Sequence, residues 1–411
     1  MSSSAGDGRR LARSLVLVLG IAAILGLGAA LIGMRAFAAQ APPEELTNEE
    51  LLARAARAAE DPPEFSASFT VEQSIFPTQL LEASGQGEGP PALSGPLNAR
   101  VWYGGPDQIR AELQGENGDR IFVRNGSKTW IYDGAANALR TGESASQTPT
   151  PEVGSVTPAE VNRLLDELAP TSELSQEEPV RFVGRQAYVL TLTPKDGGST
   201  LVNRAQALID SETYLPLRYT LYADGHSDPV FSWRVSSFDA GPVPSNLFDF
   251  QTPPGAKVRS LAPEGNPPQP ERPDRAEPAE PETAKAKTVA EAQRSVGFRI
   301  RELSDPPGDR ELTGVYLKGE DGVVLTYGSG WGTVILAQGP QQKGAATPPG
   351  NGDTGGNLQQ LPTADLGGGV EAQELSTPVG SGLRWSADGV SYVLAGSVPA
   401  PELEQAARGL R

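Results

Sequence analysis

The sequence predicts a mainly β protein: an open antiparallel half-barrel with a helical lid, then a Pro-rich linker and a small α+β domain, all behind an N-terminal transmembrane helix. Three observations lead to this fold class. Arg181–Tyr222 has the pattern of three successive strands joined by turn-forming residues. Gly and Pro number 47 and 37 among 411 residues, which favours a β-rich or loop-rich chain over a helical one. The strand-like segments also do not alternate with helices in the way that indicates a parallel sheet.

The three strands predicted within this stretch are Val180–Thr193, Leu201–Asp210 and Leu215–Tyr222. Apolar and polar residues alternate along them, most clearly in the third, because successive side chains of a strand point to opposite faces. The resulting sheet has one apolar face, which requires a cover.

The N-terminus contains three arginines within its first 13 residues, followed by Ser14–Met34, which is 21 residues without a charge. This length is sufficient to span a bilayer as a helix, and the arginines predict a cytoplasmic N-terminus. Residues 1–39 are therefore interpreted as a signal anchor that holds the protein in the cell membrane as a single-pass protein. Cleavage of a signal peptide near Ala38 is the alternative, and it would give a secreted protein. Both interpretations place the bulk of the chain outside the cytoplasm.

The first domain is predicted over residues 45–258, with about eight or nine antiparallel strands and two helices. Thr47–Glu50 is a capping box that begins the first helix. Pro158–Leu168 is the second helix, with Leu164 and Leu168 on its apolar face. The remaining strands are expected at Phe65–Phe76, Leu97–Tyr103, Gln108–Leu113, Arg120–Arg124, Lys128–Tyr132 and Phe231–Phe238.

Residues 259–287 are rich in Pro, Glu and Ala and are interpreted as a linker. Residues 288–411 are predicted to form a small α+β domain that ends in the helix Pro401–Leu410. Its strands are expected at Gly314–Leu317, Val323–Tyr327, Thr333–Ala337, Val370–Leu375, Gly382–Ser386 and Val390–Ala395.

Composition and motifs exclude several classes of function. The net charge of −17 argues against nucleic-acid binding, because a phosphate backbone selects basic surfaces. The chain has no cysteine and a single histidine, His226, so we expect no enzyme, no metal site and no cofactor. The Gly-rich segment Gly328–Gly332 is interpreted as a hairpin turn rather than a phosphate loop, because no helix is expected after it. Asp353–Gly355 matches an aspartic-protease triplet, but no second triplet exists to supply the paired carboxylate.

Four segments in order resemble LolA-like lipoprotein carrier proteins over residues 45–258. They are Leu97–Arg110, Ile121–Asp133, Ala207–Arg218 and Phe248–Ala256. The resemblance implies an open barrel whose concave side takes acyl chains, with helices as a lid. The same fold occurs in periplasmic regulators similar to RseB and MucB, which restrain anti-sigma factors.

The C-terminal domain resembles a small domain of unknown function found on membrane-anchored bacterial proteins. Trp385, Gly389 and Tyr392 carry most of this likeness. The role of the domain is left open by the resemblance.

The leading hypothesis is therefore a membrane-anchored, extracytoplasmic binding protein that holds a lipid, a lipoprotein or an acyl chain. The alternative is an envelope-stress regulator that binds a membrane-bound anti-sigma factor or another membrane partner. Twelve apolar residues are candidates for lining the cavity, although they could equally form an ordinary barrel core. These are Trp102, Ile109, Trp130, Tyr132, Leu164, Leu168, Tyr188, Leu190, Leu208, Leu217, Tyr219 and Leu221.

Overall fold

The computed structural model describes residues 43–75, 96–115, 118–143, 169–195, 200–261, 283–286, 288–318, 321–341 and 361–410. The predicted membrane segment Ser14–Met34, the predicted helix Pro158–Leu168 and the triplet Asp353–Gly355 lie outside these residues. Among the residues that are described, no helix has the length and apolar character needed to cross a membrane.

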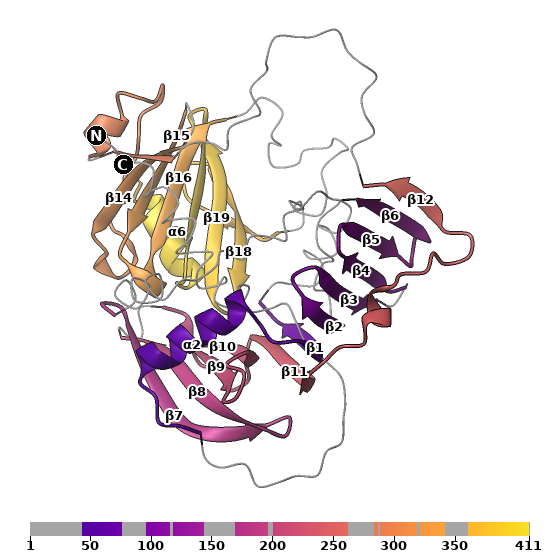
Figure 1. The fold of residues 1–411 in the computed structure, drawn as a ribbon. Coiled ribbons are helices and arrows are strands. Elements are labelled where there is room, and N and C mark those ends of the chain that lie inside the picture. Colours follow the sequence, from indigo (N-terminus) through magenta and orange to yellow (C-terminus); the bar gives the residue numbers. More distant parts are fainter. Residues whose placement is uncertain are drawn as a thin grey trace, which may run out of the picture.

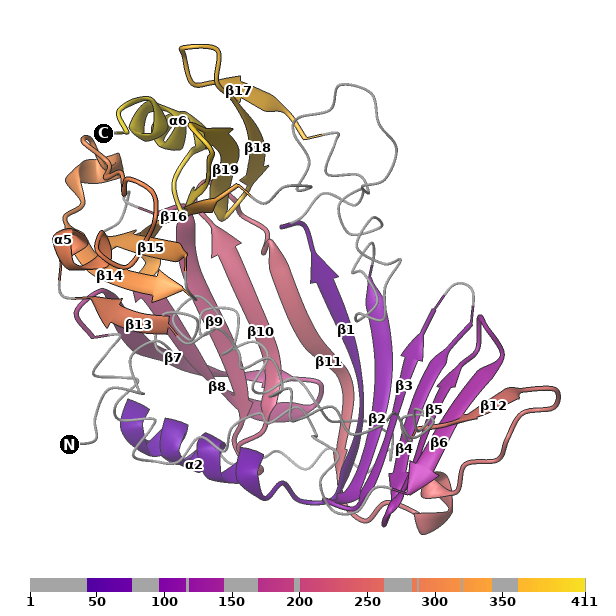
Figure 2. The same ribbon diagram turned by 90° about the horizontal axis from the view of Figure 1, so that it is seen from above.

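The N-terminal part is a strongly bent, open sheet made of two six-stranded halves (Figures 1 and 2). The first half has the order β1 (Phe65–Gln73), β11 (Phe231–Ala240), β10 (Pro216–Ala223), β9 (Val202–Asp210), β8 (Arg185–Pro194) and β7 (Ser172–Phe182). The second half has the order β12 (Lys257–Ser260), β6 (Ala138–Glu143), β5 (Lys128–Asp133), β4 (Arg120–Asn125), β3 (Gln108–Gln114) and β2 (Leu97–Gly105).

The two halves meet where β1 lies beside β2 (Figure 2). The Thr70 hydroxyl donates to Asn98 Oδ1 at 2.9 Å, and the rings of Phe65 and Tyr103 stack with centroids 5.3 Å apart. One apolar cluster spans this junction. The predicted class, a mainly β fold with an open sheet, is therefore confirmed.

The strand count and one pairing differ from the sequence prediction. The described residues of this part form twelve strands where eight or nine were expected, and β12 pairs in parallel with β6 rather than antiparallel. The predicted strand Val180–Thr193 is wrong at its start, because a turn at Val183 and Gly184 (φ 43° and 83°) separates β7 from β8. β7 was missed because its Glu-rich, largely exposed sequence has no apolar alternation, as is common for an edge strand.

A single helix, α2 (Asn48–Glu60), lies across the N-terminal sheet in the described part of this domain (Figure 1). Its predicted capping box is confirmed: Thr47 Oγ1 accepts from the Glu50 amide at 3.2 Å, and Glu50 Oε2 accepts from the Thr47 amide at 2.9 Å. The bonds satisfy two backbone donors, one at the Thr47 cap and one in the first turn.

Replacing Thr47 with Ala is expected to lower the free energy of unfolding of α2 by about 1 kcal/mol, because the cap oxygen is lost. Hydrogen exchange of the α2 amides measures this change directly. Amides of the C-terminal sheet serve as the internal control and should exchange at unchanged rates. Unchanged exchange in α2 as well would contradict the assigned role of the cap.

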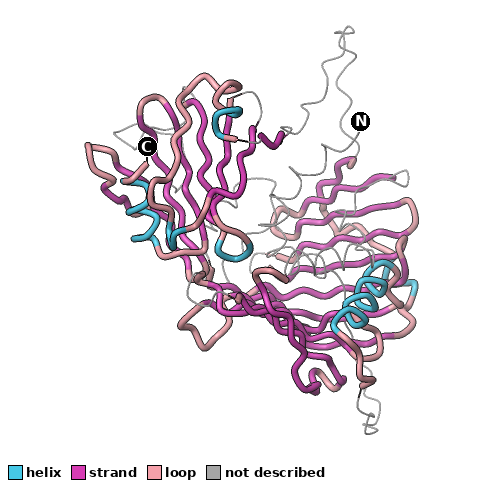
Figure 3. The backbone as a smooth tube through the Cα atoms, turned by 90° about the vertical axis from the view of Figure 1, so that its left-hand side faces the viewer, coloured by secondary structure: helices cyan, strands magenta, loops and turns pink. Residues whose placement is uncertain are grey.

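The C-terminal part is an eight-stranded antiparallel sheet with α6 (Ala400–Arg408) against one face (Figure 2). Figure 3 shows it as a group of strands separate from the N-terminal sheet. Leu336, Leu394 and Leu403 are fully buried between the sheet and α6. The strand order is β13 (Thr283–Ala286), β14 (Leu312–Lys318), β15 (Gly322–Tyr327), β16 (Val334–Pro340), β20 (Val390–Gly396), β19 (Gly380–Ala387), β18 (Glu371–Thr377) and β17 (Thr363–Asp365).

Four short elements complete the description: η1 (Ser245–Phe248), α5 (Val289–Ala292), η2 (Pro307–Asp309) and η3 (Gly330–Gly332). The predicted linker, residues 259–287, begins within β12 and ends beyond β13, so both of its ends contribute strand residues. Each end pairs with a different sheet, since β12 joins β6 and β13 joins β14.

Candidate functional site

Three aromatic side chains form the centre of one face of the N-terminal sheet. The Trp233 ring on β11 lies 5.6 Å from the Phe69 ring on β1 and 5.6 Å from the Tyr219 ring on β10, centroid to centroid. Tyr219 and Trp233 are direct cross-strand partners, so the pair adds to the packing of the sheet. Phe69, Tyr219 and Trp233 are called the aromatic cluster below.

This face is also the one on which α2 packs. By register, Tyr219 lies opposite Ala207 and Ala207 opposite Leu190, which places the three side chains in one row on a common face. Leu190 belongs to the buried cluster of Leu51 and other α2 residues. The name "helix face" is used for this side of the sheet.

The aromatic cluster contains two buried donors that have no hydrogen-bond partner among the described residues, Tyr219 Oη and Trp233 Nε1. Both side chains are 4% exposed. Burial raises the pKa of Tyr219 well above its ordinary value, so the hydroxyl keeps its proton and remains a donor. An unsatisfied buried donor costs about 1–3 kcal/mol, so two neighbouring ones require a reason.

The helix α2 is held to the sheet by a small number of polar contacts around an apolar centre. Asn48 Nδ2 donates to the Leu174 carbonyl at 3.0 Å, and Arg54 Nη1 donates to Tyr214 Oη at 2.5 Å. Leu51 is fully buried and packs in the cluster with Tyr188 and Leu190. The helix α2 therefore covers this part of the helix face and is held there by its own apolar and polar contacts.

Six of the twelve candidate residues lie in the buried clusters of the first half-sheet. Tyr188 and Leu190 lie under α2. Leu208, Leu217 and Tyr219 share one buried cluster with Trp233. Leu221 packs in another cluster together with Trp331 of the C-terminal part.

Four other candidates have different surroundings, and the last two, Leu164 and Leu168, lie outside the described residues. Val101 belongs to the buried cluster of Tyr219 and Trp233, so its neighbour Trp102 points away from the helix face. There the Arg110 guanidinium lies 5.8 Å from the Trp102 ring centroid. Trp130 and Tyr132 lie against Phe250, at 6.5 and 6.1 Å between centroids. Ile109 is half-buried opposite Tyr103.

Sequence reasoning missed Trp233 and Phe69 as members of the site. Both residues lie in segments that were predicted to be strands, and the apolar alternation of those segments could have identified them as members of a buried face. Their contact depends on the pairing of β1 with β11, which are separated by more than half of the domain sequence.

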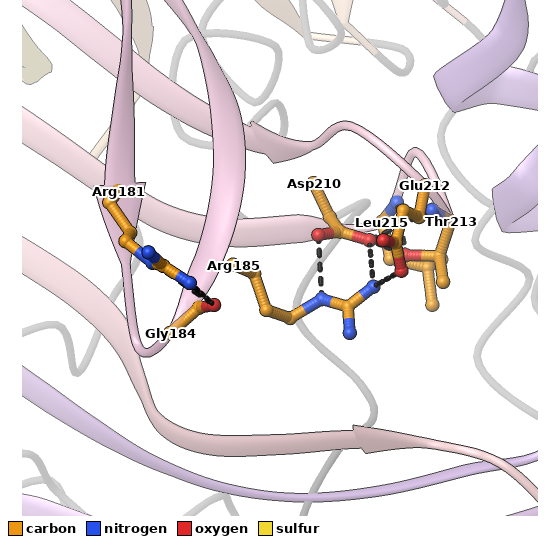
Figure 4. Close-up of polar contacts among 7 residues, drawn as sticks. All are labelled: Arg181, Gly184, Arg185, Asp210, Glu212, Thr213 and Leu215. Atoms are coloured by element: carbon orange, nitrogen blue, oxygen red, sulfur yellow. Dashed lines mark hydrogen bonds and ion pairs between the residues drawn. The ribbon is translucent and has the colours of Figure 1, made fainter. Parts of the chain in front are cut away.

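A buried ion pair fixes the turn between β9 and β10 (Figure 4). Asp210 is fully buried and accepts from Arg185 Nε at 2.7 Å, from Arg185 Nη2 at 2.8 Å and from the Thr213 amide and hydroxyl at 2.8 and 2.7 Å. Burial acts to lower the pKa of Arg185, but its bonds to Asp210 and Glu212 outweigh burial, and the pKa is raised above its ordinary value. Among the described residues, no buried side-chain atom of this network lacks a hydrogen-bond partner, so we interpret the network as structural.

The Gly-rich turn Gly328–Gly332 connects β15 with β16, as expected for a hairpin connection, and it also docks the C-terminal part onto the N-terminal sheet. Trp331 Nε1 donates to Ser172 Oγ at 2.9 Å, and the indole packs beside Leu221. A second contact joins Ser397 to Thr200, whose hydroxyl oxygens are 2.7 Å apart.

No family model and no curated protein matches this chain. Among solved structures, the chain is similar to the MucA/MucB complex of Pseudomonas aeruginosa, with a TM-score of 0.40 and 18% identity over 88% of this chain and 98% of that chain. It is also similar to a LolA superfamily protein from Nitrosomonas europaea, with a TM-score of 0.20 and 11% identity over 50% of this chain and 99% of that chain. The similar structures thus include MucB and LolA-superfamily proteins, the two groups named by the sequence resemblance.

Within the described ranges, no group of three or more His, Asp or Glu side chains is arranged to hold a metal ion. His226 is exposed in the turn after β10, where its Nδ1 lies 2.9 Å from the Asp224 carbonyl oxygen.

Proposed function

We propose that this protein is an extracytoplasmic, membrane-anchored binding protein whose helix face holds an acyl chain of a lipid or a lipoprotein. The observation that carries the proposal is the pair of unpartnered donors, Tyr219 Oη and Trp233 Nε1, inside an apolar surface. A purely structural core has no use for such donors and would be more stable without them.

The chemistry of the aromatic cluster favours an acyl ester or amide over a plain hydrocarbon. The carbonyl oxygen of such a ligand is an acceptor for Tyr219 Oη and Trp233 Nε1, while its methylenes contact the surrounding apolar side chains. Each buried methylene contributes about 0.8 kcal/mol, so about ten of them contribute about 8 kcal/mol before the costs of association.

Access to this face requires movement of its cover. The aromatic cluster is buried, and the apolar side of α2 occupies the neighbouring surface over Tyr188 and Leu190. We infer that α2 moves as a lid when ligand enters, because its attachment depends on few polar contacts, such as those of Asn48 and Arg54.

The proposal predicts that a fluorescent fatty-acid ester binds the purified full chain and is displaced by unlabelled lipid. Tyr219→Phe and Trp233→Phe each remove one donor and keep an aromatic ring. Each is expected to weaken the ester about threefold to tenfold, in line with one hydrogen bond. Tyr219→Phe should leave the empty protein as stable as or more stable than the wild type, whereas Trp233→Phe also loses packing of the indole.

The matched control is Tyr132→Phe, which alters a tyrosine on the other half of the sheet, beside Phe250. It should leave ester binding unchanged. The absence of displaceable binding at micromolar concentration, together with no lipid co-purifying in native mass spectrometry, would rule out the carrier proposal.

A second candidate is a regulator that binds a membrane partner such as an anti-sigma factor. It is favoured by the burial of the aromatic cluster and by the docking of the C-terminal part through Trp331. An empty barrel that retains a membrane protein in pull-down experiments from its native membrane supports this function instead.

A further inference from the structure

A groove of about 530 Å³ lies on the face of the N-terminal sheet opposite the helix face. Arg218, Thr220 and Tyr222 of β10 line it, and they alternate along the strand with Tyr219 and Leu221, which point to the other side. Ser232 and Arg234 of β11, Phe182 of β7 and two carboxylates, Glu72 and Asp228, continue the lining.

Two arginines lie side by side in this groove. Arg218 and Arg234 are direct cross-strand partners, and like charges in that position destabilise a sheet. Arg234 forms an ion pair with Glu72 at 3.0 Å. Arg218 instead donates from Nη2 to the neutral Gln206 Oε1 at 2.9 Å and lies 5.6 Å from the Phe182 ring centroid. Among the described residues no carboxylate forms an ion pair with Arg218, so its charge is not neutralised.

Two further polar atoms in the groove are buried and have no hydrogen-bond partner in the part of the chain that the structure describes. They are the Nε of Arg218 and the hydroxyl of Thr220, whose side chain is 5% exposed. Both can donate, and both belong to side chains that line the groove. An oxyanion with several acceptor oxygens would satisfy both donors and separate the two guanidinium charges.

We propose that this groove binds a phosphate group, either free or carried by a lipid headgroup. A tetrahedral phosphate has enough oxygens to accept from Arg218, Thr220 and Arg234 at once. Glu72 is already paired with Arg234, so Arg218 is the cation of the groove that the described carboxylates leave available to an anionic ligand. The site is independent of the acyl-binding proposal, because it uses the opposite side of the same strands.

The organic part of such a ligand would contact the aromatic walls of the groove. Tyr222 lies under the Arg204 guanidinium, which is 3.8 Å from its ring centroid, and this contact places another cation beside the site. Phe182 forms the wall next to Arg218.

Calorimetric titration of the full chain in a non-ionic detergent tests the proposal with three ligands. They are inorganic phosphate, dihexanoyl phosphatidic acid and, as the ligand without phosphate, dihexanoyl glycerol. Binding of at least one phosphate ligand with a Kd below about 1 mM is expected, and dihexanoyl glycerol should not compete for it. Binding of inorganic phosphate identifies a free-phosphate site, whereas binding of phosphatidic acid alone identifies a headgroup site.

Two variants assign the binding to the groove. Arg218→Gln should weaken phosphate binding about tenfold or more, and Thr220→Val, which keeps the side-chain volume, should weaken it about threefold to tenfold. Arg100→Gln, which removes an exposed charge on β2 outside the groove, is the matched control and should bind as the wild type does.

The melting temperature separates loss of the site from loss of the fold. Phosphate should raise it for the wild type and for Arg100→Gln but not for Arg218→Gln. The proposal is overturned if no phosphate ligand binds below about 1 mM, or if Arg100→Gln weakens binding as much as Arg218→Gln does.

Discussion

Replacing Asp210 with Ala is expected to lower the free energy of unfolding of the N-terminal sheet by about 3–5 kcal/mol. The substitution leaves the Arg185 guanidinium, whose side chain is 17% exposed, without its bidentate partner. It also removes the two bonds that Thr213 makes in the β9–β10 turn. Urea unfolding followed by tryptophan fluorescence measures the change as a lower midpoint with an unchanged slope.

The matched control is Asp107→Ala. Asp107 also pairs with an arginine, Arg124, at 2.9 Å, but its side chain is 66% exposed. Exposed ion pairs contribute about 0–1 kcal/mol, so this variant should unfold close to the wild type. Equal effects of the two substitutions would show that burial of the Arg185–Asp210 pair does not set its contribution.

Replacing Trp331 with Ala is expected to separate the C-terminal part from the N-terminal sheet. The substitution removes the indole packed beside Leu221 and the bond to Ser172, and truncation of a buried aromatic residue costs about 3–5 kcal/mol. Small-angle scattering should show a larger radius of gyration, and limited proteolysis should cut faster between the two parts.

Two further variants test whether the loss comes from this contact. Trp331→Phe keeps most of the packing and loses only the bond to Ser172, so it should remain docked. Gly330→Ala should separate the parts although Trp331 is intact, because a Cβ there would lie 2.3 Å from Thr171 Oγ1 and φ is +59°. A compact Gly330→Ala protein would contradict the docking assigned to this turn.

The alternation of apolar and polar residues predicted most strands of both sheets, because each strand has one buried face. β9 and β10 are close to their predicted bounds. β7 could not be found in this way, since its Glu-rich edge position shows no alternation. The parallel return of β12 could not be found either, because four exposed residues have no pattern that specifies a partner strand.

The candidate site could be predicted only within single strands. Tyr219 was identified because its own strand alternates, whereas Trp102 was grouped with it although the two side chains lie on opposite faces. The sequence cannot specify which face of one strand continues the face of another when the two are not consecutive. The docking role of Trp331 could not be predicted for the same reason, because its partner Ser172 is separated from it by 159 residues.

The two proposed binding surfaces share one strand, β10, whose Tyr219 belongs to the aromatic cluster and whose Arg218, Thr220 and Tyr222 line the groove. A bulge between Pro216 and Arg218 sets which residues fall on which side. The insertion of a single residue after this bulge would exchange the two sets of side chains. It would turn Arg218 and Thr220 toward the helix face and Tyr219 toward the groove. β10 should therefore tolerate changes of side chain far better than changes of length, and any ligand that shifts its backbone on one face must also shift the opposite binding surface.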